Sequence, residues 1–360
     1  MEISKNEFEI DDTIGMELDV LEEISKQNHK NLITLIHFYT WRDEVNFVFP
    51  FVAGNLEKLF SGKWSLKTYE AIGDVPNHWL WQQMIGVADG LRTIHVLDVH
   101  QYDPSRGRTI GFHFDLKPAN ILITSGGVLK ITDFGQSMIK LVRPGAREYG
   151  TFTGGDPAYQ APEGHPTRPA MLEMFEVLKN STATSASTSA TGCLEGFHMD
   201  VTSKFDVWSL ACIMLEVLVY IKDETGGYVS FRKDRGNGTF LDDTRSLKDC
   251  VTRRLSSLCG TNPPRLDISF REEPSYIRDI VSLLRDMFSI SPKDRPSSTE
   301  VCEKLEQIRL KYPGVDNTEA EILKALDDEK VEERFVEAGW LDEHGINAFS
   351  LMYVFEFLAF

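Results

Sequence analysis

Residues 111–123 read GFHFDLKPANILI, and the segment that follows at 130–136 reads KITDFGQ. An acid, a lysine and an amide stand close together in the first stretch, and a further acid precedes a glycine in the second. Between them the apolar runs ILIT and VLKIT flank Ser-Gly-Gly at 125–127, which predicts a small β-hairpin. These charged and amide groups beside a hairpin are the part of the chain that most needs a chemical explanation.

Length and composition limit the classes of protein to which the chain can belong. Its 360 residues can bury a large core, which favours one two-lobed domain or two domains. Apolar residues make up 42% and charged residues 26%, as in ordinary soluble globular proteins. The net charge of −17 argues against a nucleic-acid binder that contacts the phosphate backbone. It does not exclude nucleotide binding, because a bound metal ion supplies local positive charge.

The cysteines and the apolar segments predict a cytoplasmic or nuclear protein rather than a secreted one. The five cysteines form no C-x-x-C pair and are odd in number, which favours reduced thiols. The first residues, MEISKNEFEIDD, lack the basic and apolar regions of a signal peptide. The apolar segment 207–221 contains Ser209 and Glu216 and is short for a membrane span. We therefore expect it to form a buried core helix.

Hydrophobic periodicity predicts a chain of mixed α and β structure. Apolar side chains recur at helical spacing in some segments, whereas β-branched and aromatic runs mark others as strands. The expected helices cover 16–27, 78–95, 205–221, 275–288 and about 298–311, the expected strands lie within 31–40 and 45–52 with a turn at 42–44, and the expected loops cover 98–110 and 135–165.

Several short blocks resemble the eukaryotic protein kinase family, serine/threonine type, in the order in which that family carries them. Each block alone is weak, but their combination in this order rarely arises by chance. The blocks are HFDLKPAN (113–120), DFG (133–135), AYQAPE (158–163), FDVWSLAC (205–212) and SPKDRPS (291–297). Long insertions give the chain a weak likeness to divergent fungal kinases.

The resemblance implies an α+β fold of two lobes. Residues 1–52 would form a partial small lobe of few antiparallel strands and one helix, and 53–312 a mainly helical large lobe. A low-complexity insert falls within 164–204, and we expect it to be a disordered spacer or a docking segment. Residues 313–360 would form an acidic helical extension with an apolar end, which either packs on the large lobe or binds a protein partner.

By resemblance, the chain transfers the γ-phosphate of MgATP to serine or threonine hydroxyls of proteins. Asp115 would accept the hydroxyl proton, and Lys117 would hold the γ-phosphate. Asn120 and Asp133 would offer oxygen ligands to Mg²⁺. Lys117 is also the family's mark of serine/threonine specificity. The alternative for each residue is a solvated loop charge.

The small lobe supplies the expected nucleotide contacts. In FVFPFVAGNL (47–56), Phe49 would be the gatekeeper, and the backbone of Pro50 and Val52 would face the adenine. Glu17 would pair with the lysine that contacts ATP, and Leu21, one turn on, would touch Phe134. An ordinary buried strand is the alternative for the first segment.

Other positions are expected to be scaffold, and two depart from the family pattern. Glu163 and Arg295 would form a buried ion pair, and Asp206 would accept hydrogen bonds from the backbone of the 113–120 loop. Phe114 replaces the arginine that grips an activation-loop phosphate, so we expect a site that does not need this switch. Asp156 replaces a threonine, and its charge beside Lys117 would compete with phosphate.

Two parts of the family's small lobe are missing from the sequence. No glycine-rich hairpin precedes Glu17, and Lys5 is either the stub of the lysine-bearing strand or a solvated residue after it. Three explanations stay open: an N-terminally incomplete chain of an active kinase, a pseudokinase that acts as a binding scaffold, or a weakly active enzyme. The retained Asp115, Asn120 and Asp133 favour the first.

Overall fold

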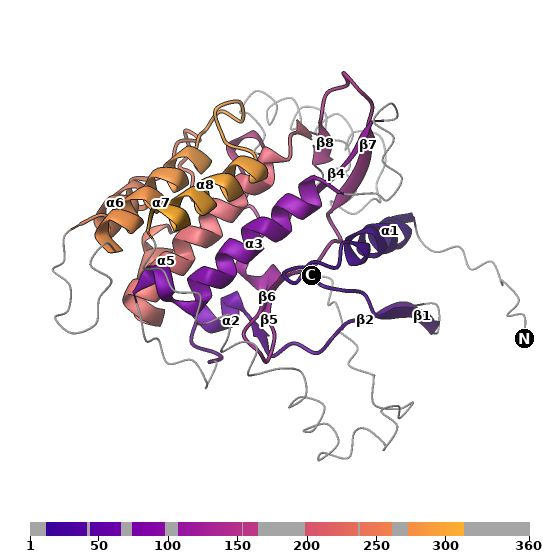
Figure 1. Cartoon of the computed structure of the whole chain (residues 1–360), viewed down its shortest axis with the longest axis horizontal. Helices are drawn as coiled ribbons and strands as arrows, with labels where there is room; N and C mark the ends of the chain where they lie inside the picture. The colour runs from indigo at the N-terminus through magenta and orange to yellow at the C-terminus, as the bar shows by residue number, and fades with distance from the viewer. Residues whose placement is uncertain are drawn as a thin grey trace, which may run out of the picture.

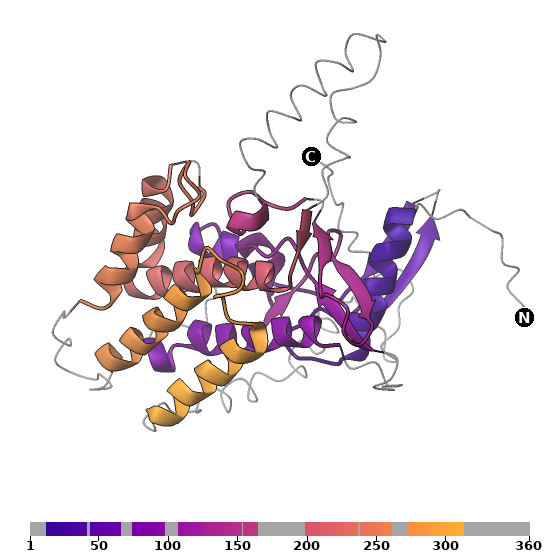
Figure 2. The ribbon, with the colours of Figure 1, turned by 90° about the horizontal axis from the view of Figure 1, so that it is seen from above.

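The structure is a computed structural model, and it describes part of the chain. The described residues are 12–41, 44–65, 74–97, 107–152, 154–164, 199–236, 238–260 and 273–312. They form an α+β fold in which a small group of elements lies at one end of a larger helical body (Figure 1, Figure 2). This architecture agrees with the two-lobed fold class predicted from the sequence.

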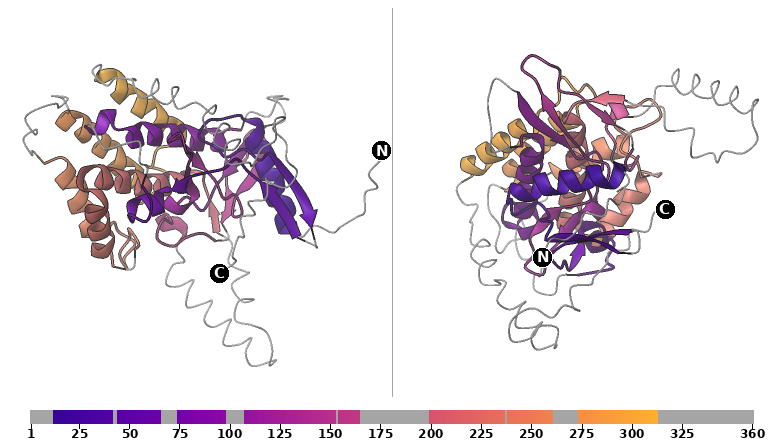
Figure 3. Two further views of the ribbon diagram at one scale, coloured as in Figure 1. Left: turned by 90° about the horizontal axis from the view of Figure 1, so that it is seen from below. Right: turned by 90° about the vertical axis from the view of Figure 1, so that its right-hand side faces the viewer.

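The described part of the small lobe consists of one helix beside a two-stranded antiparallel sheet (Figure 3). Helix α1 (Asp12–Lys26) buries Val20, Leu21 and Ile24 on one face, which is the amphipathic pattern that its sequence predicts. Strands β1 (His37–Trp41) and β2 (Glu44–Val48) pair along their whole length.

The strand expected over 31–40 begins later than predicted because its first residues bond to the large lobe. Asn31 accepts a backbone hydrogen bond from Ile131, and the backbone N–H of Ile33 donates to the carbonyl of Ile131. Residues 31–33 therefore connect the lobes instead of extending β1.

The large lobe contains most of the described helices and several short strands. Its elements are β3 (Gly54–Asn55), α2 (Leu56–Phe60), α3 (Trp79–His95), β4 (Arg108–Phe112), β5 (Ile121–Ile123), β6 (Leu129–Ile131), β7 (Met138–Val142), β8 (Gly150–Phe152), β9 (Met199–Val201), α5 (Lys204–Asp234), α6 (Asp249–Leu258), α7 (Glu273–Met287) and α8 (Ser298–Lys311). The expected hairpin is present, since β5 pairs antiparallel with β6.

Helices α3 and α5 form the centre of the core. Every residue of α5 from Phe205 to Val219 is buried, which confirms the buried helix predicted over 207–221. Trp81 of α3 donates a hydrogen bond to the hydroxyl of Tyr276 on α7 at 2.8 Å, so even the polar edge of its ring is satisfied. No helix in the described part of the chain is long and apolar enough to cross a membrane.

Two predicted loops contain strands. Residues 108–110, expected in a loop, belong to β4, which pairs antiparallel with β7 inside the expected 135–165 loop. A side chain at Gly111 would approach the carbonyl oxygen of Ile94 to 2.5 Å, so glycine is what lets β4 lie against the end of α3. Strand β8 lies in the second predicted loop as well and pairs with β9. Helices α2 and α6 were not predicted either.

Some expectations fall outside the described residues. They concern the turn residues 42–43, Lys5 and the segment before α1, most of the 164–204 insert, and the extension after residue 312.

Candidate active site

The loop at 113–120 is fixed to the first turn of α5 by a buried carboxylate. Asp206 accepts hydrogen bonds from the backbone N–H groups of His113 and Phe114, both at 2.8 Å. Phe114 has a φ of 66°, a left-handed conformation that a bulky residue rarely adopts without such support. The predicted scaffold role of Asp206 is therefore confirmed.

His95 contributes to the same anchor. Its Nε2 lies 3.1 Å from Asp206, and its Nδ1 lies 2.9 Å from the hydroxyl of Ser298. Burial acts to raise the pKa of Asp206, but the hydrogen bond and charge of His95 together with the contacts of His113 outweigh it, so the pKa lies below its usual value.

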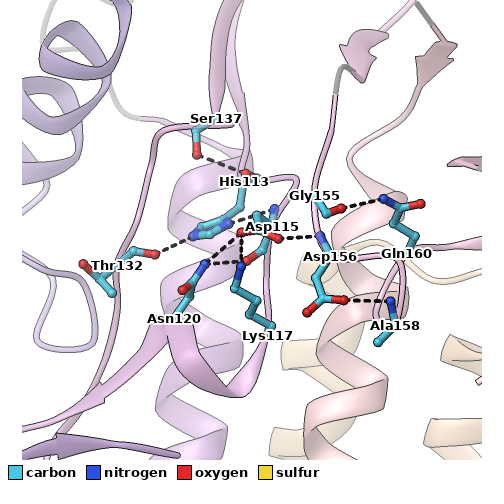
Figure 4. A network of polar contacts seen from close by, with 10 residues as sticks. All are labelled: His113, Asp115, Lys117, Asn120, Thr132, Ser137, Gly155, Asp156, Ala158 and Gln160. Carbon is cyan, nitrogen blue, oxygen red and sulfur yellow. Dashed lines mark hydrogen bonds and ion pairs between the residues drawn. The ribbon is translucent and has the colours of Figure 1, made fainter. Parts of the chain in front are cut away.

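Three of the predicted site residues are joined directly. The Nζ of Lys117 lies 2.6 Å from Asp115 Oδ2, and Asn120 Nδ2 donates to the same oxygen at 3.1 Å and to the Asp115 carbonyl at 2.9 Å. The backbone N–H of Asp156 donates to Asp115 Oδ1 at 2.8 Å. Figure 4 shows these groups converging on the Asp115 carboxylate. The carboxylate is thus held through both of its oxygens.

Asp133 lies within electrostatic range of two other predicted site residues. Burial acts to lower the pKa of Lys117, but the hydrogen bond to Asp115 and the charges of Asp115, Asp133 and Asp156 raise it overall. Burial and then the charge of Asp133 raise the pKa of Glu17. A side chain at Gly135 would lie 3.6 Å from Asp133 Oδ1 and 3.7 Å from Glu17 Oε2, so Gly135 lies against both carboxylates.

Glu17 has no cationic partner in the part of the chain that the structure describes. Its expected function is to pair with a lysine, and the only candidate that the sequence offers upstream, Lys5, lies outside the described residues. The structure therefore brings Glu17 to the DFG segment without showing the ion pair predicted for it. Leu21 and Phe134 are both buried in the same apolar core.

The predicted adenine contacts lie in the connection between the lobes. Phe49, Pro50 and Val52 follow β2, are partly buried, and precede Ala53, whose N–H donates to the Ile123 carbonyl at 2.8 Å. No hydrogen bond or ion pair within the described ranges joins these three residues to the Asp115 group. Their predicted contact with adenine therefore stays a prediction.

The oxygen donors present fit a hard divalent ion. No hydrogen bond to Asn120 Oδ1 or to the Asp133 carboxylate appears among the described residues, so both keep free lone pairs. The described ranges hold no cluster of three or more His, Cys, Asp or Glu side chains able to form an all-protein metal cage. Mg²⁺ commonly takes one or two protein oxygens and keeps its waters, and this donor set suits such an ion.

Phe114 occupies an aromatic cluster in place of the arginine expected at its position. Its ring centroid lies 5.1 Å from Phe112, 5.7 Å from Phe152 and 5.9 Å from Phe205. A side chain at Gly150 would meet the Phe114 ring at 2.8 Å, so β8 packs closely on it. The cluster thus fixes β8 to the 113–120 loop by apolar contact.

The predicted ion pair between Glu163 and Arg295 is present and bidentate. The Nη1 and Nη2 atoms donate to the two carboxylate oxygens at 2.7 and 3.0 Å. The guanidinium also donates to the carbonyl oxygens of Ser289 and Lys204. This buried pair fixes the segment after Tyr159 to the helical core.

Sequence reasoning missed several contacts of the site. Ser137 donates to the carbonyl of His113 at 3.1 Å, and His113 Nε2 lies 3.0 Å from the Thr132 carbonyl, so both sides of the DFG segment are bound to the loop. The predicted interference from Asp156 considered only its charge, whereas its backbone N–H orients Asp115. A histidine two residues before Asp115 was the available signal for the contact with Thr132, whereas the contact with Ser137 involves only the backbone carbonyl of His113.

Comparison with known proteins agrees with this fold. The family model "Protein kinase domain" matches residues 1–168. The serine/threonine-protein kinase ICK of Rattus norvegicus is 24% identical over 313 residues, which cover 83% of this chain and 38% of the relative. A probable cell division protein kinase of Encephalitozoon cuniculi is 29% identical over 209 residues, 57% of each chain. The serine/threonine-protein kinase crk1 of Schizosaccharomyces pombe is 32% identical over 126 residues, 34% of this chain and 32% of the relative.

The architecture is thus that of a protein kinase-like domain. The family model covers residues 1–168, somewhat less than half of the 360-residue chain, and over that part the chain is similar to eukaryotic protein kinases. The chain spans less than two thirds of the length of each relative named here.

Proposed function

We propose that the chain transfers the γ-phosphate of MgATP to serine or threonine hydroxyls of proteins. The observation that carries the proposal is the Asp115 carboxylate, which is held by Lys117 at 2.6 Å and by the backbone N–H of Asp156 at 2.8 Å. A carboxylate fixed in this way can accept a proton in a defined direction. The names of the relatives, which include serine/threonine-protein kinases, support the substrate class.

In the proposed reaction, the substrate hydroxyl oxygen bonds to the γ-phosphorus as the bond from that phosphorus to the β-phosphate oxygen breaks. The hydroxyl proton passes to Asp115, and ADP leaves with the electron pair of the broken bond. Lys117 places positive charge beside the transferring group. Asn120 and Asp133 would hold Mg²⁺, which when bound neutralises charge on the phosphates.

The aromatic cluster around Phe114 supports a site that is assembled without phosphorylation of its activation segment. No guanidinium is present at this position to grip a phosphate, and apolar packing fixes β8 instead. We therefore expect phosphatase treatment to leave the activity unchanged.

Phosphate transfer from labelled ATP to a degenerate serine/threonine peptide library tests the proposal. We expect the wild-type protein to label peptides, and Asp115→Asn to reduce the rate by about 10²- to 10⁴-fold. Millimolar MgATP should raise the melting temperature of both proteins, because a ligand that binds the folded state stabilises it by mass action. Asp133→Asn should weaken the magnesium-dependent part of that rise.

A non-catalytic scaffold is the second candidate, and the environment of Glu17 favours it. A carboxylate near Asp133 without a cation in the described ranges lacks the pairing that the family uses to position ATP. If neither transfer nor a melting-temperature shift with MgATP is seen, the catalytic proposal fails and the scaffold function is preferred. In both cases the expected partners are proteins.

A further inference from the structure

Helix α5 reverses its course near its middle, where one residue has an unusual backbone conformation. Glu224 has φ 55° and ψ −160°, a region that residues other than glycine rarely adopt. The residues after it, 225–235, are here called the return segment. They pass beside α2, where the rings of Tyr228 and Phe60 lie 4.9 Å apart. The return segment brings its last residue, Arg235, back towards the buried part of α5.

Arg235 forms an ion pair with Glu216 in the core. Its Nη2 donates to Glu216 Oε1, and the side chains are 1% and 0% exposed. The guanidinium carbon lies 4.1 Å from the ring centroid of Phe240 and 4.8 Å from that of Phe231. Its Nε and Nη1 have no hydrogen-bond partner in the described part of the chain. Glu216 is therefore its one anionic contact there, and the aromatic faces supply the rest of its stabilisation.

The second oxygen of Glu216 binds the segment beside the catalytic residues. The hydroxyl of Tyr159 donates to Glu216 Oε2 at 3.0 Å. Burial raises the pKa of Glu216 above its ordinary value, and the charge of Arg235 limits this rise and favours the ionised carboxylate. An ionised Glu216 makes the stronger, charge-assisted bond to the tyrosine. Arg235 thus acts on Tyr159 through the carboxylate between them.

Tyr159 in turn belongs to the segment that orients Asp115. The N–H of Tyr159 donates to the carbonyl of Asp156 at 3.0 Å, and the carbonyl of Tyr159 accepts a hydrogen bond from the hydroxyl of Ser209 at 2.8 Å. Asp156 then donates its backbone N–H to Asp115 Oδ1. Gln160 closes the segment by donating to the carbonyl of Gly155 at 2.9 Å. A continuous series of contacts, buried at Arg235, Glu216 and Tyr159 and partly buried at Asp156, therefore runs from Arg235 to Asp115.

We propose that Arg235 is a positioning residue for the substrate-binding segment 155–160, acting through Glu216 and Tyr159. The proposal rests on the kinase function proposed above. If Asp115 accepts the proton of a serine or threonine hydroxyl, the segment 155–160 beside it lies next to the bound peptide. In the absence of the Arg235 charge, the segment loosens and peptide substrate binds less well. ATP binding, which the sequence assigns to residues 49–52 in the connection between the lobes, stays unchanged.

Arg235→Met is the direct test, and Arg232→Met is its matched control. Arg232 lies one turn earlier on the same return segment and pairs with the exposed Glu57 at 3.4 Å. We expect Arg235→Met to raise the KM for the best library peptide roughly tenfold, the loss of one charge-assisted hydrogen bond. The KM for ATP should change by less than about twofold. Tyr159→Phe removes only the hydroxyl that binds Glu216. We expect it, too, to raise the KM for peptide and to leave the KM for ATP almost unchanged.

Amide hydrogen exchange gives a second readout that does not depend on phosphate transfer. Arg235→Met and Tyr159→Phe should speed exchange in a peptide covering 155–161, whereas Arg232→Met should not. Equal exchange in all three variants, or a loss of protection spread over the whole large lobe, would overturn the positioning role. An unchanged peptide KM in an active enzyme would overturn it as well.

Two further variants keep the test decisive if Arg235→Met does not fold. Glu216→Gln with Arg235→Met removes both buried charges, which proteins often tolerate, and Arg235→Lys keeps the positive charge. We expect the lysine variant to recover protection at 155–161 at least in part, and the double variant to fold without recovering it fully. If the wild-type protein transfers no phosphate, only the proposed function is refuted. The comparison of amide hydrogen exchange between the variants still decides whether Arg235 positions the segment 155–160.

Discussion

Two carboxylates, Asp206 in the large lobe and Glu17 in the small lobe, have opposite surroundings. Asp206 is fully buried and accepts two backbone hydrogen bonds, with His95 3.1 Å away. Burial disfavours its charge, but His95 and His113 together outweigh burial and lower its pKa. Glu17 is partly buried, and burial followed by the charge of Asp133 raises its pKa.

The difference shows which half of the site is complete within the described chain. In the large lobe, Asp206, Glu163 and Glu216 each have a basic partner or several donors, so the catalytic loop is held before any ligand arrives. In the small lobe, Glu17 faces another acid, and no cation in the described ranges compensates it. The fold itself therefore positions the catalytic loop of the large lobe. In the small lobe, Glu17 needs an additional positive charge to be positioned in the same way.

The largest expected effect comes from removing the large-lobe anchor. Asp206→Ala leaves two buried N–H groups and His95 without their acceptor, and we expect the free energy of unfolding to fall by about 3–5 kcal/mol. Urea denaturation at neutral pH measures this change. Because the folded-state pKa of Asp206 lies below the ordinary 3.8, its stabilisation is present above that pH and is lost as the pH falls through the lower value.

Glu306→Ala is the control for this change. Glu306 is exposed and, among the described residues, pairs with Arg309 on the same helix, so its loss should leave stability almost unchanged. If both variants lost the same small amount of stability, Asp206 would not be the anchor that the geometry indicates.

An intermediate effect is expected for the aromatic cluster. Phe114→Leu keeps an apolar side chain but removes ring contacts with Phe112, Phe152 and Phe205, and we expect a loss of about 1 kcal/mol. Thermal unfolding monitors it, and Phe51→Leu, at a residue 57% exposed, serves as the control. A larger loss for Phe51→Leu than for Phe114→Leu would contradict apolar attachment of β8 to the loop.

Short motifs with local geometry could be predicted from the sequence, whereas long-range pairs could not. The 113–120 loop, the hairpin after it and the Glu163–Arg295 pair follow from motif order, because each motif keeps its shape wherever the family carries it. Strand β4, with the letters RTIGF, has a glycine and no clear alternation. Its structure depends on pairing with β7 about thirty residues later, which periodicity cannot reveal.

The pairing of Glu216 with Arg235 illustrates the same limit within one helix. An acid in the apolar run VWSLACIMLEVLVYI indicates that a partner is needed, because an unpaired buried carboxylate is costly. The sequence does not say which residue that partner is. The answer depends on the kink at Glu224, which lies beyond the end of the helix predicted over 205–221.

The smallest expected effect is a change in the pH dependence of stability at Glu17. Its folded-state pKa lies above the ordinary 4.5, so its contribution to stability is fully present below that pH and is lost as the pH rises through the raised value. Glu17→Gln removes this titration. The stability of the variant relative to the wild-type protein should therefore rise slightly between pH 4.5 and 7. Urea denaturation of both proteins across this range measures the difference, with exposed Glu22→Gln on the same helix as the control. If Glu17→Gln instead lost stability at neutral pH, a cation would already compensate Glu17, and the small lobe would be as complete as the large one.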